Sequence, residues 1–138
     1  MTGLLDTHTF IWWDSDPDQL SATALAFLQD PANTVLLSVV SPWEMLIKQQ
    51  LGKLTLRLPL QQILAQQQAN GIQILPVRLE HVLAVEGLPT PHNDPFDRLL
   101  AAHNDPFDRL LAAQAKVESV ALVSADPIFA QYPVQVLW

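Results

Sequence analysis

The sequence predicts an α/β domain in which a mainly parallel sheet of about five strands is covered by helices on both faces. Three observations support this fold class. Short apolar runs alternate with helix-length segments along the chain. Apolar residues make up 49% of the chain and charged residues 15%, which is typical of a folded globule. The 138 residues suffice for one domain with a buried core and leave no room for a second catalytic domain.

Five runs are predicted to be strands because they are short, apolar and compatible with extended backbone. They are Gly3 to Leu5, Thr34 to Val39, Ile72 to Leu75, Val120 to Val123 and Val134 to Leu137. The segments between them include the predicted helices Ser21 to Leu28, Pro42 to Leu51, Leu60 to Ala69 and Leu79 to Glu86. Parallel sheets of this kind bind ligands beyond the carboxyl ends of their strands, so residues that follow a strand are candidates for a functional site.

The predicted helix from Pro42 has signals at both ends. Ser41 is a favourable N-cap residue, and Pro42 suits the first helical position. Glu44 lies three residues after this cap, where an acidic side chain completes a capping box. Gly52 follows the last residue of the apolar pattern and predicts the end of the helix.

A direct repeat of HNDPFDRLLAA occupies His92 to Ala102 and again His103 to Ala113. Two copies are too few for a solenoid, so we interpret the repeat as a local insertion in a single domain of residues 1–138. The insertion could extend one helix with little rotation of its face, but Pro106 inside that helix would cost about 3 kcal/mol or more. Each Asp-Pro-Phe-Asp stretch is therefore predicted to start its own helix.

We expect the second copy of the repeat to occupy the native helix position. Asp105 to Glu118 would then lead directly into the strand that begins at Val120. The first copy would lengthen a surface loop, which costs little closure entropy. A swapped arrangement between two protomers is the open alternative.

Composition narrows the class of function. No apolar run reaches the roughly 18 residues that cross a bilayer, and Asp6 interrupts the N-terminal run, so we expect a cytoplasmic protein without a membrane partner. The absence of cysteine excludes disulfides and thiolate zinc sites. A net charge of -7 argues against nucleic-acid binding, unless the acidity is concentrated in a pocket where bound cations reverse the local field.

Four acidic residues lie where predicted strands end or predicted helices begin. They are Asp6, Glu44, Asp108 and Asp126. Such positions can converge at one edge of a parallel sheet. Clustered carboxylates bind Mg²⁺ or Mn²⁺ through oxygen, and one or two such ions activate water and stabilise the leaving oxygen of a phosphodiester. Asp6 is the strongest candidate, because a carboxylate that follows an apolar strand needs a charge partner or a metal if it is buried.

Each of these acids also has a purely structural interpretation. Glu44 and Asp108 are suited to stabilising helix N-termini. Asp126, which precedes Pro127, suits a turn or a cap, and Asp6 suits the end of a strand. For any one of them taken singly, the structural interpretation is at least as good as the functional one.

The aromatic and imidazole side chains are interpreted as structural. The histidines lack metal-ligand spacing and are expected to be surface or capping residues; they are His8, His81, His92 and His103. The four tryptophans are better explained as core anchors than as platforms for stacking bases. Trp43, next to Glu44, is the tryptophan that we expect to line the site.

Four segments together resemble the PIN-domain family: LLDTHTFIWW, SVVSPWEMLIKQQLGKL, VSADPIFAQYPVQVLW and, with one repeat copy removed, LPTPHNDPFDRLLAAQA. More narrowly, the chain is similar to the VapC-type toxin branch through its WE-IK-LGKL and HxDPFDRLL signatures. The resemblance covers nearly the whole chain and implies a PIN-like α/β/α sandwich.

The resemblance places the acidic quartet of the family on Asp6, Glu44, Asp108 and Asp126, with Asp97 in the first repeat as the competing match for Asp108. It implies a Mg²⁺- or Mn²⁺-dependent endoribonuclease that acts on RNA. It further implies the toxin of a toxin-antitoxin pair, a homodimer, and inhibition by an antitoxin protein that inserts a peptide near the acidic pocket.

The same motif region supplies secondary candidates. Asp105 or Asp94 and the following Arg109 or Arg98 match residues that would support the ligands or contact phosphate. Their structural roles would be capping and a surface ion pair. The repeat is the departure from the family pattern, because extra residues beside the catalytic acid could distort the pocket and leave the protein inactive.

Two other classes of function compete. A catalytically silent PIN-like module would only pair with an antitoxin-like protein. An aspartyl-phosphate enzyme or receiver domain also gathers acids at strand ends, but Asp6 is followed by Thr7 and His8 where a phosphatase needs a second acid. The sequence identifies neither the RNA that is cleaved nor the antitoxin.

Overall fold

The computed structural model describes residues 1–89 and 106–138. Five strands form one parallel sheet in the order β3-β2-β1-β4-β5. They are β1 (Thr2–Leu5), β2 (Thr34–Ser38), β3 (Gln73–Leu75), β4 (Ala121–Val123) and β5 (Val136–Leu137). The five predicted strands are thus confirmed, with bounds that differ by one or two residues from those expected.

The longer helices in the described ranges are α1 (Thr7–Ser15), α2 (Ala22–Gln29), α3 (Val40–Gln50), α4 (Leu60–Ala69), α5 (Leu79–Ala84) and α7 (Pro106–Glu118). Short 3₁₀ helices are η1 (Pro17–Gln19), η2 (Val85–Gly87) and η3 (Pro127–Gln131). The predicted helices are confirmed, and the one over Leu79 to Glu86 divides into α5 and η2. None of the helices described here is long and apolar enough to span a membrane.

The prediction for the start of α3 was wrong. Ser41 was expected to be the N-cap, but the helix already begins at Val40, and the hydroxyl of Ser38 accepts a hydrogen bond from the Val40 N–H at 3.1 Å. Ser41 is fully buried inside the helix. The predicted end is confirmed, because Gly52 has a φ of 72° and the helix closes with a bond from Lys53 N to Lys48 O at 2.9 Å.

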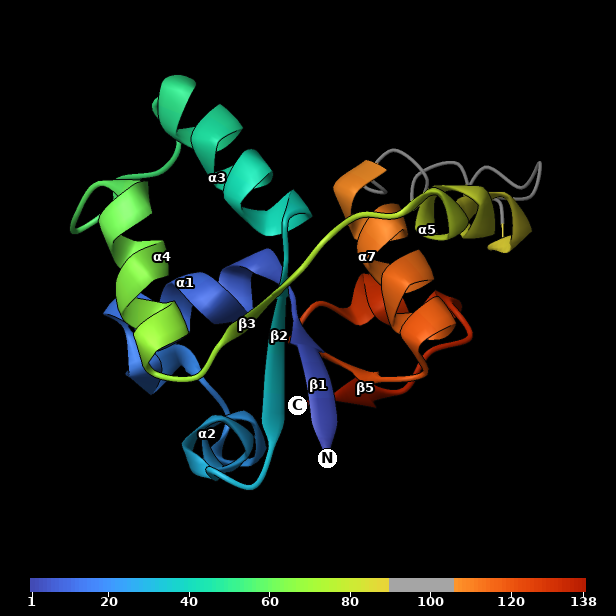
Figure 1. Ribbon diagram of the computed structural model, residues 1–138, viewed down its shortest axis with the longest axis horizontal. Coiled ribbons are helices and arrows are strands. Elements are labelled where there is room, and N and C mark those ends of the chain that lie inside the picture. Colours follow the sequence, from blue (N-terminus) through green and yellow to red (C-terminus); the bar gives the residue numbers. More distant parts are fainter. Residues whose placement is uncertain (90–105) are drawn as a thin grey trace.

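The sheet is covered on both faces, as expected for an α/β/α sandwich. Leu4 and Leu5 are consecutive residues of β1 and belong to different hydrophobic cores. The Leu4 core packs against α5, α7 and η3, whereas the Leu5 core packs against α1, α2, α3 and α4. Figure 1 shows the same division, with α1 to α4 on one side of β1 and β2 and with α5 and α7 on the other.

The second repeat copy enters the fold through α7. This helix carries residues 106–113 of the repeat, and its inner face contributes Leu111, Ala112 and Ala113 to the Leu4 core. It ends at Glu118 and reaches β4 through Ser119, which has a φ of 54°. The predicted helix from Asp105 to Glu118 is therefore confirmed from Pro106 onward. The first copy, including Asp97, lies outside the described residues.

Candidate active site

A pocket of about 260 Å³ lies at the carboxyl ends of the central strands. Its lining residues come from the segment after β1, from α3, from the first turn of α7 and from the segment after β4. They are Asp6, Thr7, His8, Glu44, Lys48, Asp108 and Asp126. All four acidic residues singled out in the sequence thus face one pocket, although they are distant along the chain.

Asp6 links the end of β1 to the start of α1. Its Oδ1 accepts a hydrogen bond from the backbone N–H of Thr9 at 2.8 Å and so caps the helix. Its Oδ2 accepts a hydrogen bond from the hydroxyl of Ser124, which follows β4. Only 6% of the residue is exposed, and this burial raises the pKa of Asp6, while the hydrogen bonds from Ser124 and Thr9 act in the opposite direction.

Glu44 is held by two partners from different sides. The hydroxyl of Thr7 donates to Glu44 Oε1 at 2.6 Å, and that hydroxyl also forms a hydrogen bond with Ser41 at 3.0 Å. Lys48, one turn along α3, places its Nζ 2.9 Å from Glu44 Oε2. Because α3 begins at Val40, Glu44 lies a full turn inside the helix and does not cap it, so the capping interpretation of this residue was wrong.

The other two acids combine a structural role with a place in the pocket. Asp126 caps η3, since its Oδ1 accepts a hydrogen bond from Ile128 N at 3.0 Å. Its own N–H donates to Ser124 Oγ at 3.0 Å, so Ser124 connects Asp126 to Asp6. Asp108 lies in the first turn of α7, where the helix dipole favours a negative charge.

The oxygen donors of the four acids suit a hard divalent cation. Within residues 1–89 and 106–138, no three acidic or histidine side chains are placed to hold one metal ion. Lys48 occupies one oxygen of Glu44, and protein donors occupy both oxygens of Asp6. Carboxylate oxygens are the ligands that Mg²⁺ and Mn²⁺ prefer, and a cation beside Asp6 would favour the ionised form that burial disfavours.

Comparison with known proteins identifies the family. The family model described as "PIN domain" matches residues 3–135. The chain belongs to the PIN domain family. A comparison with curated protein sequences gives no match.

Several solved structures share the fold of this PIN domain. A chain of VapBC2 from Rickettsia felis, bound to a DNA fragment from the promoter, superimposes with a TM-score of 0.65 and 15% identity over 99% of this chain and 97% of that chain. VapBC-1 from nontypeable Haemophilus influenzae superimposes with a TM-score of 0.57 and 15% identity, over 99% of this chain and 96% of that chain. FitAcB from Neisseria gonorrhoeae superimposes with a TM-score of 0.54 and 21% identity, over 97% of this chain and 95% of that chain. At these identities the likeness shows the fold.

Two residues that contact the acids of the PIN domain pocket were missed in the sequence. Lys48 lies four residues after Glu44 on a predicted helix, and this spacing was the signal that could have revealed the ion pair. Ser124 directly follows a predicted strand, like Asp6, but a lone serine at a strand end carries no distinctive pattern. Its role depends on β1 and β4 being neighbours, which the sheet order decides.

The predictions that the histidines are surface or capping residues, and that Trp43 lines the site, are confirmed in part and wrong in part. His81 is a capping residue, since its Nδ1 accepts from Arg78 N at 2.9 Å, but it is fully buried and not on the surface. His8 is exposed yet lines the acidic pocket. Trp43 is 57% exposed and packs edge-on against Phe107, so it is neither a core anchor nor a lining residue of the pocket.

Arg109 does not reach the pocket of the PIN domain. Its guanidinium donates to the carbonyl of Pro89 at 3.1 Å and to that of Val85 at 3.3 Å, and it lies 5.9 Å from the centre of the Tyr132 ring. These contacts tie α7 to η2 and to the segment after η3. They differ from both the surface ion pair and the phosphate contact considered for this residue. Asp94, Arg98 and Asp105 lie outside the described residues, as do His92 and His103.

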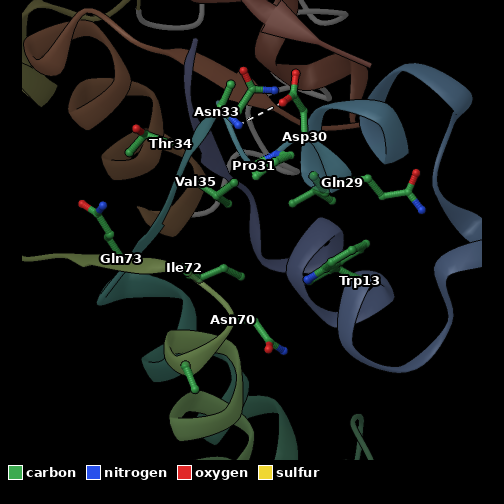
Figure 2. Close-up of a pocket in the computed structure, with 14 residues that line it drawn as sticks. Trp13, Gln29, Asp30, Pro31, Asn33, Thr34, Val35, Asn70, Ile72 and Gln73 are labelled. Carbon is green, nitrogen blue, oxygen red and sulfur yellow. Dashed lines mark hydrogen bonds between the residues drawn. The ribbon is translucent and has the colours of Figure 1, made fainter.

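A larger cavity, of about 570 Å³, opens at the opposite end of the sheet. Figure 2 shows it between Asn33 and Thr34, where β2 begins, and Asn70, Ile72 and Gln73, around the start of β3. Its polar lining consists mainly of amides and hydroxyls, with Asp30 as the one ionisable side chain among its lining residues. Despite its size, this cavity therefore offers a single carboxylate among its lining residues and no cluster of ionisable side chains.

Proposed function

We propose that this PIN domain is a metal-dependent endoribonuclease and acts as the VapC-type toxin of a type II toxin-antitoxin pair. One observation carries the proposal: carboxylates from four separate segments, Asp6, Glu44, Asp108 and Asp126, line a single small pocket at the carboxyl end of a parallel sheet. Such an arrangement is costly for folding unless cations balance it, which makes a function for the charges the better explanation.

The four carboxylates would hold Mg²⁺ or Mn²⁺, which when bound supplies an activated water and stabilises the charge on the leaving oxygen. The chain's own contribution is to orient the ligands. Ser124 positions one oxygen of Asp6, and Thr7 positions one oxygen of Glu44. Lys48 is the lysine that lines the pocket, and it can move from Glu44 to a phosphate oxygen of RNA.

The net charge of -7 is compatible with an RNA substrate if it is concentrated where cations bind. The pocket supports this view, because four of the fourteen acidic side chains line it together with one lysine. A bound divalent ion would turn this region from repulsive to attractive for phosphate. The affinity would then depend on the metal more than on basic side chains.

An antitoxin protein and a second copy of the chain are the proposed protein partners. The similar structures are of VapBC and FitAB complexes, which supports a partner of the antitoxin kind. Exposed apolar side chains on α3 and α5 supply surface for such contacts, and they include Trp43, Leu46, Leu79 and Leu83. Large exposed apolar side chains that gather on a surface are typical of interfaces.

A cleavage assay on structured RNAs tests the proposed function. Wild type is expected to cleave with Mg²⁺ or Mn²⁺ and to lose activity in EDTA. Asp6→Asn should lose at least about 100-fold, because even residues that only orient metal ligands contribute roughly 10- to 100-fold. Asp30→Asn is the matched control, since Asp30 also caps a local turn but lies at the other end of the sheet.

The same assay identifies the repeat copy that supplies the third ligand. We expect Asp108→Asn to inactivate the protein and Asp97→Asn to leave it active, because Asp108 lines the pocket from α7. The reverse result would assign the role to the first repeat. Absence of cleavage by wild type with either metal, on every RNA tried, would contradict the nuclease proposal.

The ion pair between Lys48 and Glu44 favours a second candidate, a catalytically inactive PIN module that only binds an antitoxin-like protein. In that case the lysine would replace the metal permanently. Thermal unfolding with Mn²⁺ separates the two candidates. If Mn²⁺ raises the melting temperature of wild type and not of Asp6→Asn, the inactive module is excluded.

A further inference from the structure

A second hollow adjoins the acidic pocket and differs from it in chemistry. It has a volume of about 290 Å³ and is lined by Asp6, His8, Trp12, Ala125 and Asp126. Three of these residues, Asp6, His8 and Asp126, also line the acidic pocket, so the two spaces adjoin at these side chains. A molecule whose charged group sits among the carboxylates would therefore have its neighbouring atoms close to the side chains of α1.

The rings of His8 and Trp12 line this hollow, and Trp138, which is not a lining residue, packs against Trp12. The ring centres of His8 and Trp12 are 5.9 Å apart and tilted by 43°, and those of Trp12 and Trp138 are 5.9 Å apart and tilted by 52°. His8 is exposed, and Trp12 is only partly buried although it packs on the Leu5 core. Trp12 is thus both an anchor of the core and an accessible aromatic surface.

The neighbouring residue of α1 shows that this position is distinctive. Trp13 lines the large cavity at the amino end of the sheet (Figure 2). Its indole N–H donates to Gln67 Oε1 at 3.1 Å. Two consecutive tryptophans on one helix therefore serve opposite ends of the sheet. Only Trp12 lies beside the carboxylates, which makes Trp13 its natural control.

We propose that His8 and Trp12 form a stacking site for one RNA base next to the phosphate that is cleaved. The inference rests on the proposed nuclease function and specifies its substrate as single-stranded RNA, because a base must leave its helical stack to reach the rings. Small-molecule pockets typically begin at roughly 300 Å³, so a hollow of about 290 Å³ suits one ring system. Stacking on an aromatic ring tolerates any base, since every base presents a π-face.

Abasic substitution in the RNA tests the proposal without altering the protein. Once a cleavage site is mapped, the base on each side of it is removed in turn. Removal of the stacked base should weaken binding by about 5- to 150-fold, which corresponds to roughly 1–3 kcal/mol at 1.4 kcal/mol per tenfold. Removal of a base several positions away should have little effect. Equal effects at all positions would overturn the stacking site.

Protein variants supply the complementary arm. Trp12→Leu should raise KM by a similar factor, and Trp12→Phe should restore most of the affinity because it keeps a ring and fills much of the core. Trp13→Phe should leave KM unchanged. If Trp12→Leu fails to fold, Trp12→Phe and wild type are compared on intact and on abasic RNA. The two proteins should have equal KM values when the stacked base is absent.

The two proposals can fail separately. If wild type cleaves RNA but abasic substitution and Trp12 variants have no local effect, the nuclease function stands and the stacking site is wrong. If wild type does not cleave, quenching of tryptophan fluorescence by a short single-stranded RNA in the presence of Mn²⁺ tests the site directly. Quenching that is lost in Trp12→Phe and kept in Trp13→Phe supports it, and quenching unchanged in both overturns it.

Discussion

The amino end of the sheet has the larger cavity and few charged side chains, whereas the carboxyl end has the smaller pocket and many. The cavity at the amino end measures about 570 Å³ and has Asp30 as its one ionisable lining residue. The pocket at the carboxyl end measures about 260 Å³ and is lined by four carboxylates, a lysine and a histidine. The comparison teaches that the larger cavity is not the better candidate for the functional site of this chain. The convergence of charged side chains favours the smaller pocket.

The direction of the helices explains why the acids gather at one end. Both α1 and α3 start just after a strand, and α7 places its first turn at the pocket, so their N–H groups and partial positive charges face the carboxylates. The amino-end cavity is bordered instead by the segments that follow the carboxyl-terminal ends of α2 and α4. Negative charge is therefore stabilised at one end of the sheet and not at the other.

The largest expected effect contrasts a charge at each end. Glu44→Gln should lower kcat/KM for RNA by at least about 100-fold, because it removes a proposed metal ligand and not just a residue that orients one. Gln73→Glu makes the opposite change at the amino end and should alter kcat/KM by less than about twofold. The reason is distance: strand β2 spans roughly 16 Å at 3.3 Å per residue, which exceeds the Debye length of about 10 Å at 0.1 M salt. A charge added at the amino end is therefore largely screened from the pocket at the carboxyl end.

Equal losses in Glu44→Gln and Gln73→Glu would break the comparison between the two ends. Circular dichroism and thermal unfolding of both variants serve as the check that each is folded. Steady-state cleavage with saturating Mn²⁺ provides the kinetic measurement.

The next effect concerns the hydroxyl that orients Glu44. Thr7→Val removes the hydrogen bonds to Glu44 and Ser41 while keeping the shape of the side chain. We expect a loss of about 10- to 100-fold in Mn²⁺ affinity, measured by isothermal titration calorimetry. Thr7→Ser is the matched control and should stay close to wild type. If Thr7→Val binds Mn²⁺ as well as Thr7→Ser does, the hydroxyl has no positioning role.

A pH dependence follows from the burial of Asp6. Its pKa is raised in the folded state relative to the ordinary value of 3.8, so the folded protein binds more protons than the unfolded chain between these two values. In EDTA, the contribution of Asp6 to stability is therefore full below the ordinary value and declines as the pH rises through the folded pKa. Mn²⁺ binds the ionised form, so its stabilising effect should grow over the same interval.

Thermal unfolding in EDTA and in Mn²⁺, from about pH 4 to about pH 8, measures this effect. At 100 times its Kd, Mn²⁺ should add about 2.7 kcal/mol of stability at the upper end of the range. Asp6→Asn should show a flatter profile in EDTA and little response to Mn²⁺. A response to Mn²⁺ that is independent of pH in wild type would contradict the assignment of Asp6 as a ligand.

The smallest effect is expected for Lys48, which would compete with a bound metal for Glu44. Lys48→Met should tighten Mn²⁺ binding by about two- to fivefold, because a partly exposed ion pair contributes up to about 1 kcal/mol. The same variant should raise KM for RNA, since a positive charge near the phosphate is lost. Lys53→Met, beyond the end of α3, is the control. Weaker Mn²⁺ binding in Lys48→Met would show that the lysine supports the metal site and does not compete with it.

Much of the fold was predictable from short-range patterns. The apolar runs predicted all five strands, and α4 has the predicted bounds. Errors arose where a residue has more than one use. Ser41 has the composition of an N-cap, but its hydroxyl contacts Thr7 inside the buried network around Glu44. Helix α1 was not predicted, because it follows β1 without a loop and its cap, Asp6, was interpreted as a metal ligand or a strand-end acid and not as an N-cap.

The identity of the four acids could be inferred from the chain, since their positions depend on where strands end and helices begin, which local sequence controls. Their partners from other elements could not, whereas Lys48 could have been paired with Glu44 from its spacing on one helix. Ser124 meets Asp6 because β1 and β4 are adjacent. Trp12 lines the hollow at the carboxyl end of the sheet and Trp13 the cavity at the amino end, because α1 directs these consecutive side chains towards opposite ends. These contacts join residues far apart in the chain, and packing of the whole sheet sets them. No local pattern in the amino-acid order encodes that packing.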